Sequence, residues 1–224
     1  MPIIDSYGKF CKDHGICGQD FVKWGLDNIV YPDPVKVKQE WNALKNNIVN
    51  GSDVYVRKYG RKGNSILIDF YNFFGIKAKP DPNNNSKATK MLQTTTGYKK
   101  FNSRKQNTNG QILQNYQVSH IFGKTKNVYC FTAPWNVCFV PKLIDPLTGH
   151  ESEGTFPISF KSKWMKAIKK KYQNYINEYN NLVRSFDIDS KLKKFFSNPS
   201  HSGYSQAERA KFEEDMKEEF SPIK

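Results

Sequence analysis

The sequence lacks any apolar run that approaches the roughly 18 residues needed for a transmembrane helix. Its first residues, MPIIDSYGKFCKDHG, also lack the charged and then apolar pattern of a signal peptide. The only cysteines are Cys11, Cys17, Cys130 and Cys138, and so small a number agrees with reduced thiols. We therefore expect a cytoplasmic protein with no membrane partner.

Acidic residues are scarce as well: 21 Asp and Glu stand against 35 Lys and Arg, for a formal net charge of +14. Such an excess costs self-repulsion that an anionic partner relieves. Nucleic acid is the usual partner, and a basic ribosomal or membrane-surface protein is the competing class. Aromatic residues, at 14%, are abundant enough to indicate a folded chain rather than a disordered one.

Residues 1–76 predict a mixed α/β region that contacts DNA. Four apolar residues at helical spacing predict a helix that stops at Asn50-Gly51; they are Val37, Trp41, Leu44 and Ile48. Residues 53–59 alternate and predict a strand, whereas residues 65–74 favour a helix over a strand.

Residues 77–111 predict a basic loop or linker. Between positions 77 and 126 the chain carries ten Lys and Arg against one acid, Asp81, and its prolines and its asparagine and threonine runs are typical of loops. This stretch is either a solvated linker or a loop that contacts DNA.

Residues 151–224 predict C-terminal helices. A long apolar stripe at helical spacing has lysines on its opposite face; the stripe is Phe160, Trp164, Ile168, Tyr172, Ile176, Tyr179 and Leu182. Ser205 and Glu208 fit a capping box for a last helix, whose apolar face is Phe212, Met216 and Phe220.

Residues 112–150 carry the pattern that indicates chemistry. We expect a strand over residues 112–118, a polar turn, a second strand over residues 127–132 and a short helix that begins near Pro134. His120 ends the first strand and Asn136 lies in the first turn of the helix. A histidine is a natural general base near neutral pH, and a hard divalent cation prefers oxygen ligands.

This segment resembles the ββα-metal core of the His-Me finger (HNH) nucleases. The resemblance implies an α+β fold, in which a β-hairpin and a short helix form the nuclease core of a largely helical chain. It implies that His120 removes a proton from the attacking water. It also implies that Asn136 ligates the metal or holds the loop of the base, and that one Mg²⁺ or Mn²⁺ ion neutralises charge on the phosphate.

The sequence departs from that family at the metal ligands. Many members have an Asp directly before the base, and this chain has Ser119, a weaker ligand. Asp145 is the best match to a third ligand position near the end of the helix, and His150 is a weaker one. No CxxC pairs are present, and the segment with Cys11, His14 and Cys17 lacks an obvious fourth ligand, so no structural zinc is expected.

These features predict a sequence-specific double-stranded DNA endonuclease, most simply a homodimeric type II restriction enzyme, because two active sites cut two strands. A homing or phage nicking endonuclease, or a non-catalytic basic nucleic-acid-binding protein, is the alternative. The candidate DNA contacts are Arg57, Lys58, Arg61, Lys62, Lys99, Lys100, Arg104, Lys105 and Lys124.

Overall fold

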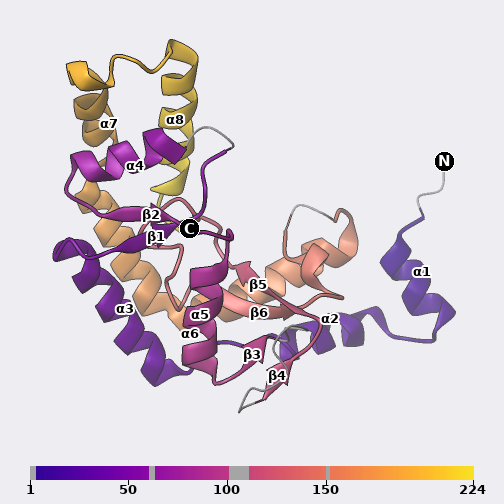
Figure 1. Cartoon of the computed structure of the whole chain (residues 1–224). Coiled ribbons are helices and arrows are strands. Elements are labelled where there is room, and N and C mark those ends of the chain that lie inside the picture. Colours follow the sequence, from indigo (N-terminus) through magenta and orange to yellow (C-terminus); the bar gives the residue numbers. More distant parts are fainter. Residues whose placement is uncertain (1–3, 61–63, 101–110, 150–151) are drawn as a thin grey trace.

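The computed structural model describes residues 4–60, 64–100, 111–149 and 152–224, and shows a mixed α/β protein that is mostly helical (Figure 1). Arg61, Lys62, Arg104, Lys105 and His150 lie outside the described residues. Within the described residues, no helix is both long and apolar enough to cross a membrane.

Three helices begin the chain: α1 (Ser6–Asp13), α2 (Gly18–Asp27) and α3 (Pro34–Val49). The Asp33 side chain accepts hydrogen bonds from two backbone amides of the first turn of α3, and Pro34 occupies the first position, where no amide is needed. The four apolar residues predicted to form one face of this helix are all buried, which confirms the prediction.

A βαβ unit follows, with α4 (Asn64–Phe73) linking the parallel strands β1 (Val54–Val56) and β2 (Ala78–Pro80). The predicted strand and the predicted helix are both confirmed. Because the strands are parallel, the residues that follow them, Arg57 and Asp81, lie at the same edge of this small sheet.

The stretch expected to be a loop or linker instead contains β2 and a helix, α5 (Ser86–Thr96), followed by the short paired strands β3 (Lys99–Lys100) and β4 (Ile112–Leu113). Asp81 explains the helix. Its buried carboxylate accepts four hydrogen bonds, from the amides of residues 83, 86 and 87 and from a serine hydroxyl. These bonds satisfy the first turn of α5 and hold the pKa of Asp81 low despite its burial.

The predicted hairpin exists, but its second strand is elsewhere. β5 (Tyr116–His120) pairs in antiparallel register with β6 (Val137–Pro141), and residues 121–136 form an irregular loop between them. Residues 127–132, expected as a strand, are turns of this loop, and no helix begins near Pro134. After β6 comes only a short 3-10 helix, η1 (Asp145–Leu147).

The C-terminal part is helical as predicted, with α6 (Thr155–Phe186), α7 (Ile188–Ser197), η2 (Pro199–His201) and α8 (Gln206–Glu219). The stripe on α6 is buried except for Leu182, which is partly exposed while Val183 is buried. The capping box of α8 is present, and its predicted apolar face is buried.

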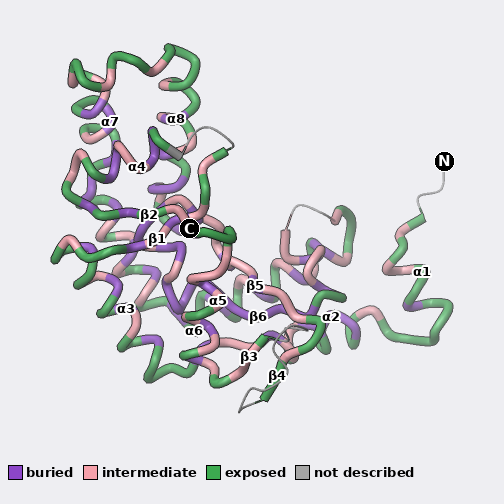
Figure 2. The backbone as a smooth tube through the Cα atoms, viewed as in Figure 1, coloured by how far each residue is buried: buried purple, intermediate pink, exposed green. Residues whose placement is uncertain are grey.

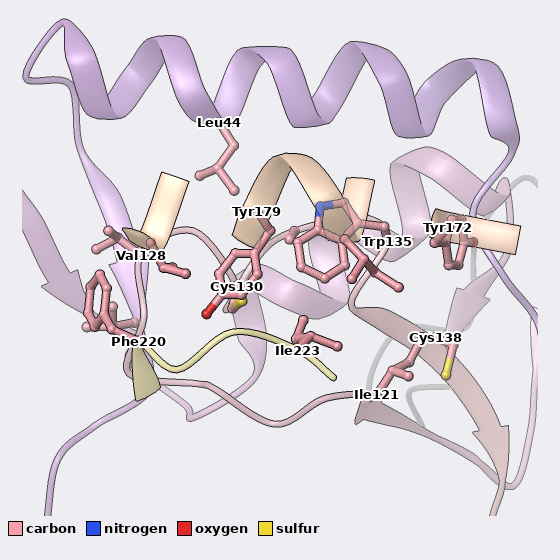
Figure 3. Close-up of a cluster of buried hydrophobic side chains, with 14 of the residues drawn as sticks. Leu44, Ile121, Val128, Cys130, Trp135, Cys138, Tyr172, Tyr179, Phe220 and Ile223 are labelled. Atoms are coloured by element: carbon pink, nitrogen blue, oxygen red, sulfur yellow. The ribbon is translucent and has the colours of Figure 1, made fainter. Parts of the chain in front are cut away.

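One large hydrophobic cluster contains residues from Cys11 to Ile223, so all four sequence ranges contribute to one core (Figure 2). Figure 3 shows its centre, where Trp135 and Cys130 of the 121–136 loop lie beside Tyr179 of α6 and Ile223 near the C-terminus. The loop is therefore packed into the body of the protein.

Candidate functional site

His120 lies at the end of β5, on the face of the hairpin that α5 covers. Successive residues of a strand point to opposite faces, and Val118, two residues earlier, packs in a small cluster with Leu92 of α5. His120 is paired across the hairpin with Val137, which belongs to the same cluster. Its side chain is only partly buried.

Hydrogen bonds fix the His120 imidazole and its tautomer. Nε2 lies 2.9 Å from the backbone oxygen of Phe131, in the 121–136 loop. That oxygen can only accept, so Nε2 carries the hydrogen and Nδ1 carries the lone pair. The ring is also stacked on the Phe131 ring, with centroids 5.3 Å apart and planes 10° apart. The loop therefore holds a neutral imidazole with a defined basic nitrogen.

Arg57 faces that nitrogen. Its Nη2 lies 3.4 Å from Nδ1 of His120 and 2.7 Å from Oδ1 of Asn85, just before α5. Its backbone amide donates to Thr125 of the loop. The buried Nε of Arg57 has no hydrogen-bond partner among the described residues. A guanidinium has five N–H donors, so Arg57 retains donors for an anion beside His120.

The electrostatics of this pair keep the histidine neutral. Burial is the largest cause that lowers the pKa of His120 to about 4, and the charge of Arg57 lowers it further. The Phe131 carbonyl and the charge of Asp81 oppose this fall. Burial also lowers the pKa of Arg57, against the charges of Glu219 and Asp81. At neutral pH the site holds an unprotonated imidazole beside a cation.

Asn136 is fully buried and fastens the 121–136 loop. Its Oδ1 accepts from the Phe122 amide at 2.9 Å, and its Nδ2 donates to the carbonyls of Gly123 and Cys130 at 3.1 and 3.0 Å. Both ends of the amide are therefore used inside the loop. Of the two roles that the resemblance allows, this geometry matches that of holding the loop.

Ser119 and Asp145 lie away from His120. Ser119 precedes His120 in β5, so its side chain points to the opposite face, and its strand partner Cys138 belongs to the large core. Asp145 accepts a hydrogen bond from Gln117, on the same face as Ser119. The ligands expected from the sequence thus do not converge with His120. Among the described residues, no three His, Cys, Asp or Glu side chains form a metal-binding group, and we derive no reaction step through a metal ion.

The predicted DNA contacts lie in different environments. Lys58 and Lys100 are exposed, and Lys99 is partly buried. Lys124 instead donates to the carbonyl of Glu218 and to the hydroxyl of Ser221, both at 2.7 Å. Its ammonium therefore fastens the loop to the C-terminal residues.

Sequence reasoning missed two groups of the site, Asn85 and the Phe131 carbonyl. A backbone carbonyl leaves no trace in the sequence. Asn85, however, follows the second parallel strand closely, and Arg57 follows the first. Pairing the 54–56 and 78–80 segments as a βαβ unit would have brought both to one sheet edge.

The comparisons with known proteins add a relationship without an activity. The model of a family described as "Uncharacterised protein PM1201" matches residues 32–224. A protein of Pasteurella multocida (strain Pm70) with the same description is 36% identical over 201 residues, which are 87% of either chain. No solved structure showed a significant match.

Proposed function

Because the chain belongs to the PM1201 family, whose description names no activity, we propose a function from the site itself: a sequence-specific endonuclease that hydrolyses phosphodiester bonds of double-stranded DNA. The observation that carries this proposal is the oriented, neutral imidazole of His120 with the guanidinium of Arg57 at its basic nitrogen. A base and an anion-binding group at one point are what attack on a phosphodiester requires.

In the proposed reaction, Nδ1 of His120 accepts a proton from water as the water oxygen bonds to phosphorus. The bond between phosphorus and the leaving 3′ oxygen breaks, and that oxygen leaves with the electron pair. Arg57 binds a non-bridging phosphate oxygen and offsets the growing negative charge. A bound phosphate also neutralises the repulsion between Arg57 and a protonated His120. It therefore raises the pKa of His120 from about 4 towards the neutral range, where a general base is most effective.

The fold around His120 supports the likeness to a ββα-metal core in part. Two antiparallel strands enclose a loop, the histidine ends the first strand and Asn136 directly precedes the second. In this proposal α6 takes the place of the core helix, since Tyr172 of α6 and Cys138 of β6 share the large cluster (Figure 3). The overall basic charge supports DNA as the substrate.

The test is cleavage of plasmid DNA with Mg²⁺ by wild type and His120→Ala. Loss of a general base typically costs roughly 10²- to 10⁴-fold in rate, and DNA binding should remain. His201→Ala is a matched control, because His201 also bonds to a backbone carbonyl and stacks on a phenylalanine, Phe195, but lies in η2. Near-normal cleavage by His120→Ala would remove the assignment.

The products separate the competing functions. Discrete linear fragments support a restriction enzyme, and open circles support a nicking enzyme. A shift of intact DNA, with no cleavage over a range of Mg²⁺ and Mn²⁺ concentrations, would favour a non-catalytic basic nucleic-acid-binding protein.

A further inference from the structure

Exposed apolar side chains are concentrated on the N-terminal helical pair, by which we mean α1, α2 and the residues joining and preceding them. Nine large apolar side chains of the described residues are exposed, and four of them belong to this pair: Ile4, Phe10, Ile16 and Trp24. Phe10 and Trp24 are 42% and 43% exposed. Phe10 contacts Phe21, and Trp24 follows Phe21 by one helical turn, so the two lie on neighbouring parts of one surface.

The helix α1 has little support from the rest of the chain. Figure 1 shows it at one end of the molecule, joined to the body through α2. Cys11 is its one buried residue, and its Tyr7 ring lies 6.2 Å from Phe21 and 6.0 Å from Phe156. A helix of two turns is marginal without packing, so a partner that covers its apolar side would stabilise it.

The charge of this pair differs from that of the body. Residues 1–31 contain three Lys and four Asp, for a net charge of −1, so residues 32–224 carry +14 − (−1) = +15. The lysines are also paired within the helices, Lys9 with Asp13 at 2.7 Å and Lys23 with Asp27 at 2.5 Å. An anionic partner such as DNA is therefore attracted to the body and not to this pair.

We propose that the N-terminal helical pair is the interface between two copies of this chain, related by a two-fold axis and meeting through Phe10, Ile16 and Trp24. Two bodies of charge +15 repel each other, and the neutral apolar pair is a surface where that repulsion is smallest. A two-fold contact places the same patch on both sides, and aromatic residues are the usual anchors of such contacts. Its use for cutting both DNA strands rests on the proposed function.

The experiment is sedimentation velocity of the full chain without DNA, over a wide range of concentrations. Wild type should sediment at twice the 26.0 kDa of one chain. Trp24→Glu, or Ile16→Glu in the loop between the helices, should raise the dissociation constant of the dimer about 30-fold or more, as for an interface hot spot. Val49→Glu is the matched control, since Val49 at the end of α3 is exposed and lies outside the pair. Circular dichroism and melting check that each variant is folded.

Three outcomes would overturn the inference: a monomeric wild type, a dimer that both folded variants leave intact, or a dimer that high salt dissociates, because apolar contacts are not screened. The outcomes are independent of catalysis. A dimer broken by Trp24→Glu in a protein that cuts no DNA would leave the interface standing and remove the nuclease. A monomer whose cleavage depends on His120 would do the reverse.

Discussion

The contact between Arg57 and His120 permits the sharpest physical prediction. Arg57→Gln removes a positive charge 3.4 Å from the basic nitrogen of the histidine. Unit charges about 4 Å apart interact by about 4 kcal/mol at an effective dielectric constant of about 20, and by about 1 kcal/mol in bulk water. Since one pH unit of pKa corresponds to about 1.4 kcal/mol and His120 is partly exposed, the pKa of His120 should rise by roughly one to two pH units.

Imidazole proton resonances followed by NMR over pH would measure this change. The His120 signal is assigned by its loss in His120→Ala, and Arg57→Lys is the matched control that keeps the charge. Wild type should titrate near the value of about 4 that burial and Arg57 set, and the lysine variant should stay close to it. An Arg57→Gln variant that titrates with wild type would refute the electrostatic account of the pair.

The same pair fixes a dependence of stability on pH. The pKa of His120 is about 4 in the folded protein and 6.5 in an unfolded chain, so the unfolded chain binds more protons between these values. This contribution to stability is present above pH 6.5 and is lost as the pH falls towards 4, by at most about 3 kcal/mol. Urea unfolding at several pH values should therefore show a smaller acid loss in Arg57→Gln than in wild type.

Three further predictions concern the loop, the DNA surface and the metal. Asn136→Ala and Asn136→Asp should both lower loop protection in hydrogen exchange and lower stability by about 1–3 kcal/mol, because a carboxylate cannot donate to the two carbonyls; a fully stable aspartate variant would contradict the clamp. Removing Lys99 and Lys100 should lower the salt slope of DNA affinity by about 0.9 for each phosphate that the variant no longer binds, whereas Lys124→Ala should change stability and leave the slope unchanged; equal slopes in all variants would contradict this division. EDTA should abolish the proposed cleavage and Mg²⁺ should restore it, and cleavage that continues in EDTA would contradict the resemblance to metal-dependent nucleases.

The helices were predictable because their signals are local. Val37 to Ile48 on α3, the capping box of α8 and the stripe on α6 each follow helical spacing over several turns. The α5 helix was missed because its first turn depends on Asp81, which satisfies it from outside the helix. An asparagine run with flanking prolines then gave a stronger signal for a loop than residues 86–96 gave for a helix.

The site was predictable as a pair of residues but not as an arrangement. His120 and Asn136 stood out by type and spacing, yet the second strand begins only after Asn136. The residues before it resemble a strand because they are buried, and their amides are satisfied by side chains and turns instead of by a neighbouring strand. Arg57 was singled out only as one basic residue among many. Its place at His120 follows from the βαβ unit and Asn85, which are contacts distant in sequence.

The anchoring of the 121–136 loop sets an order on the assembly of the protein during synthesis. Asn127 donates to the carbonyl of Glu219, Lys126 pairs with the Glu219 carboxylate, and the Lys124 ammonium binds Ser221. A ribosome therefore makes His120 about a hundred residues before the partners that fix its loop. We expect the growing chain to carry a histidine without its oriented carbonyl until α8 has emerged. The protein would then acquire its site in one late step, when nearly all of the chain has been made.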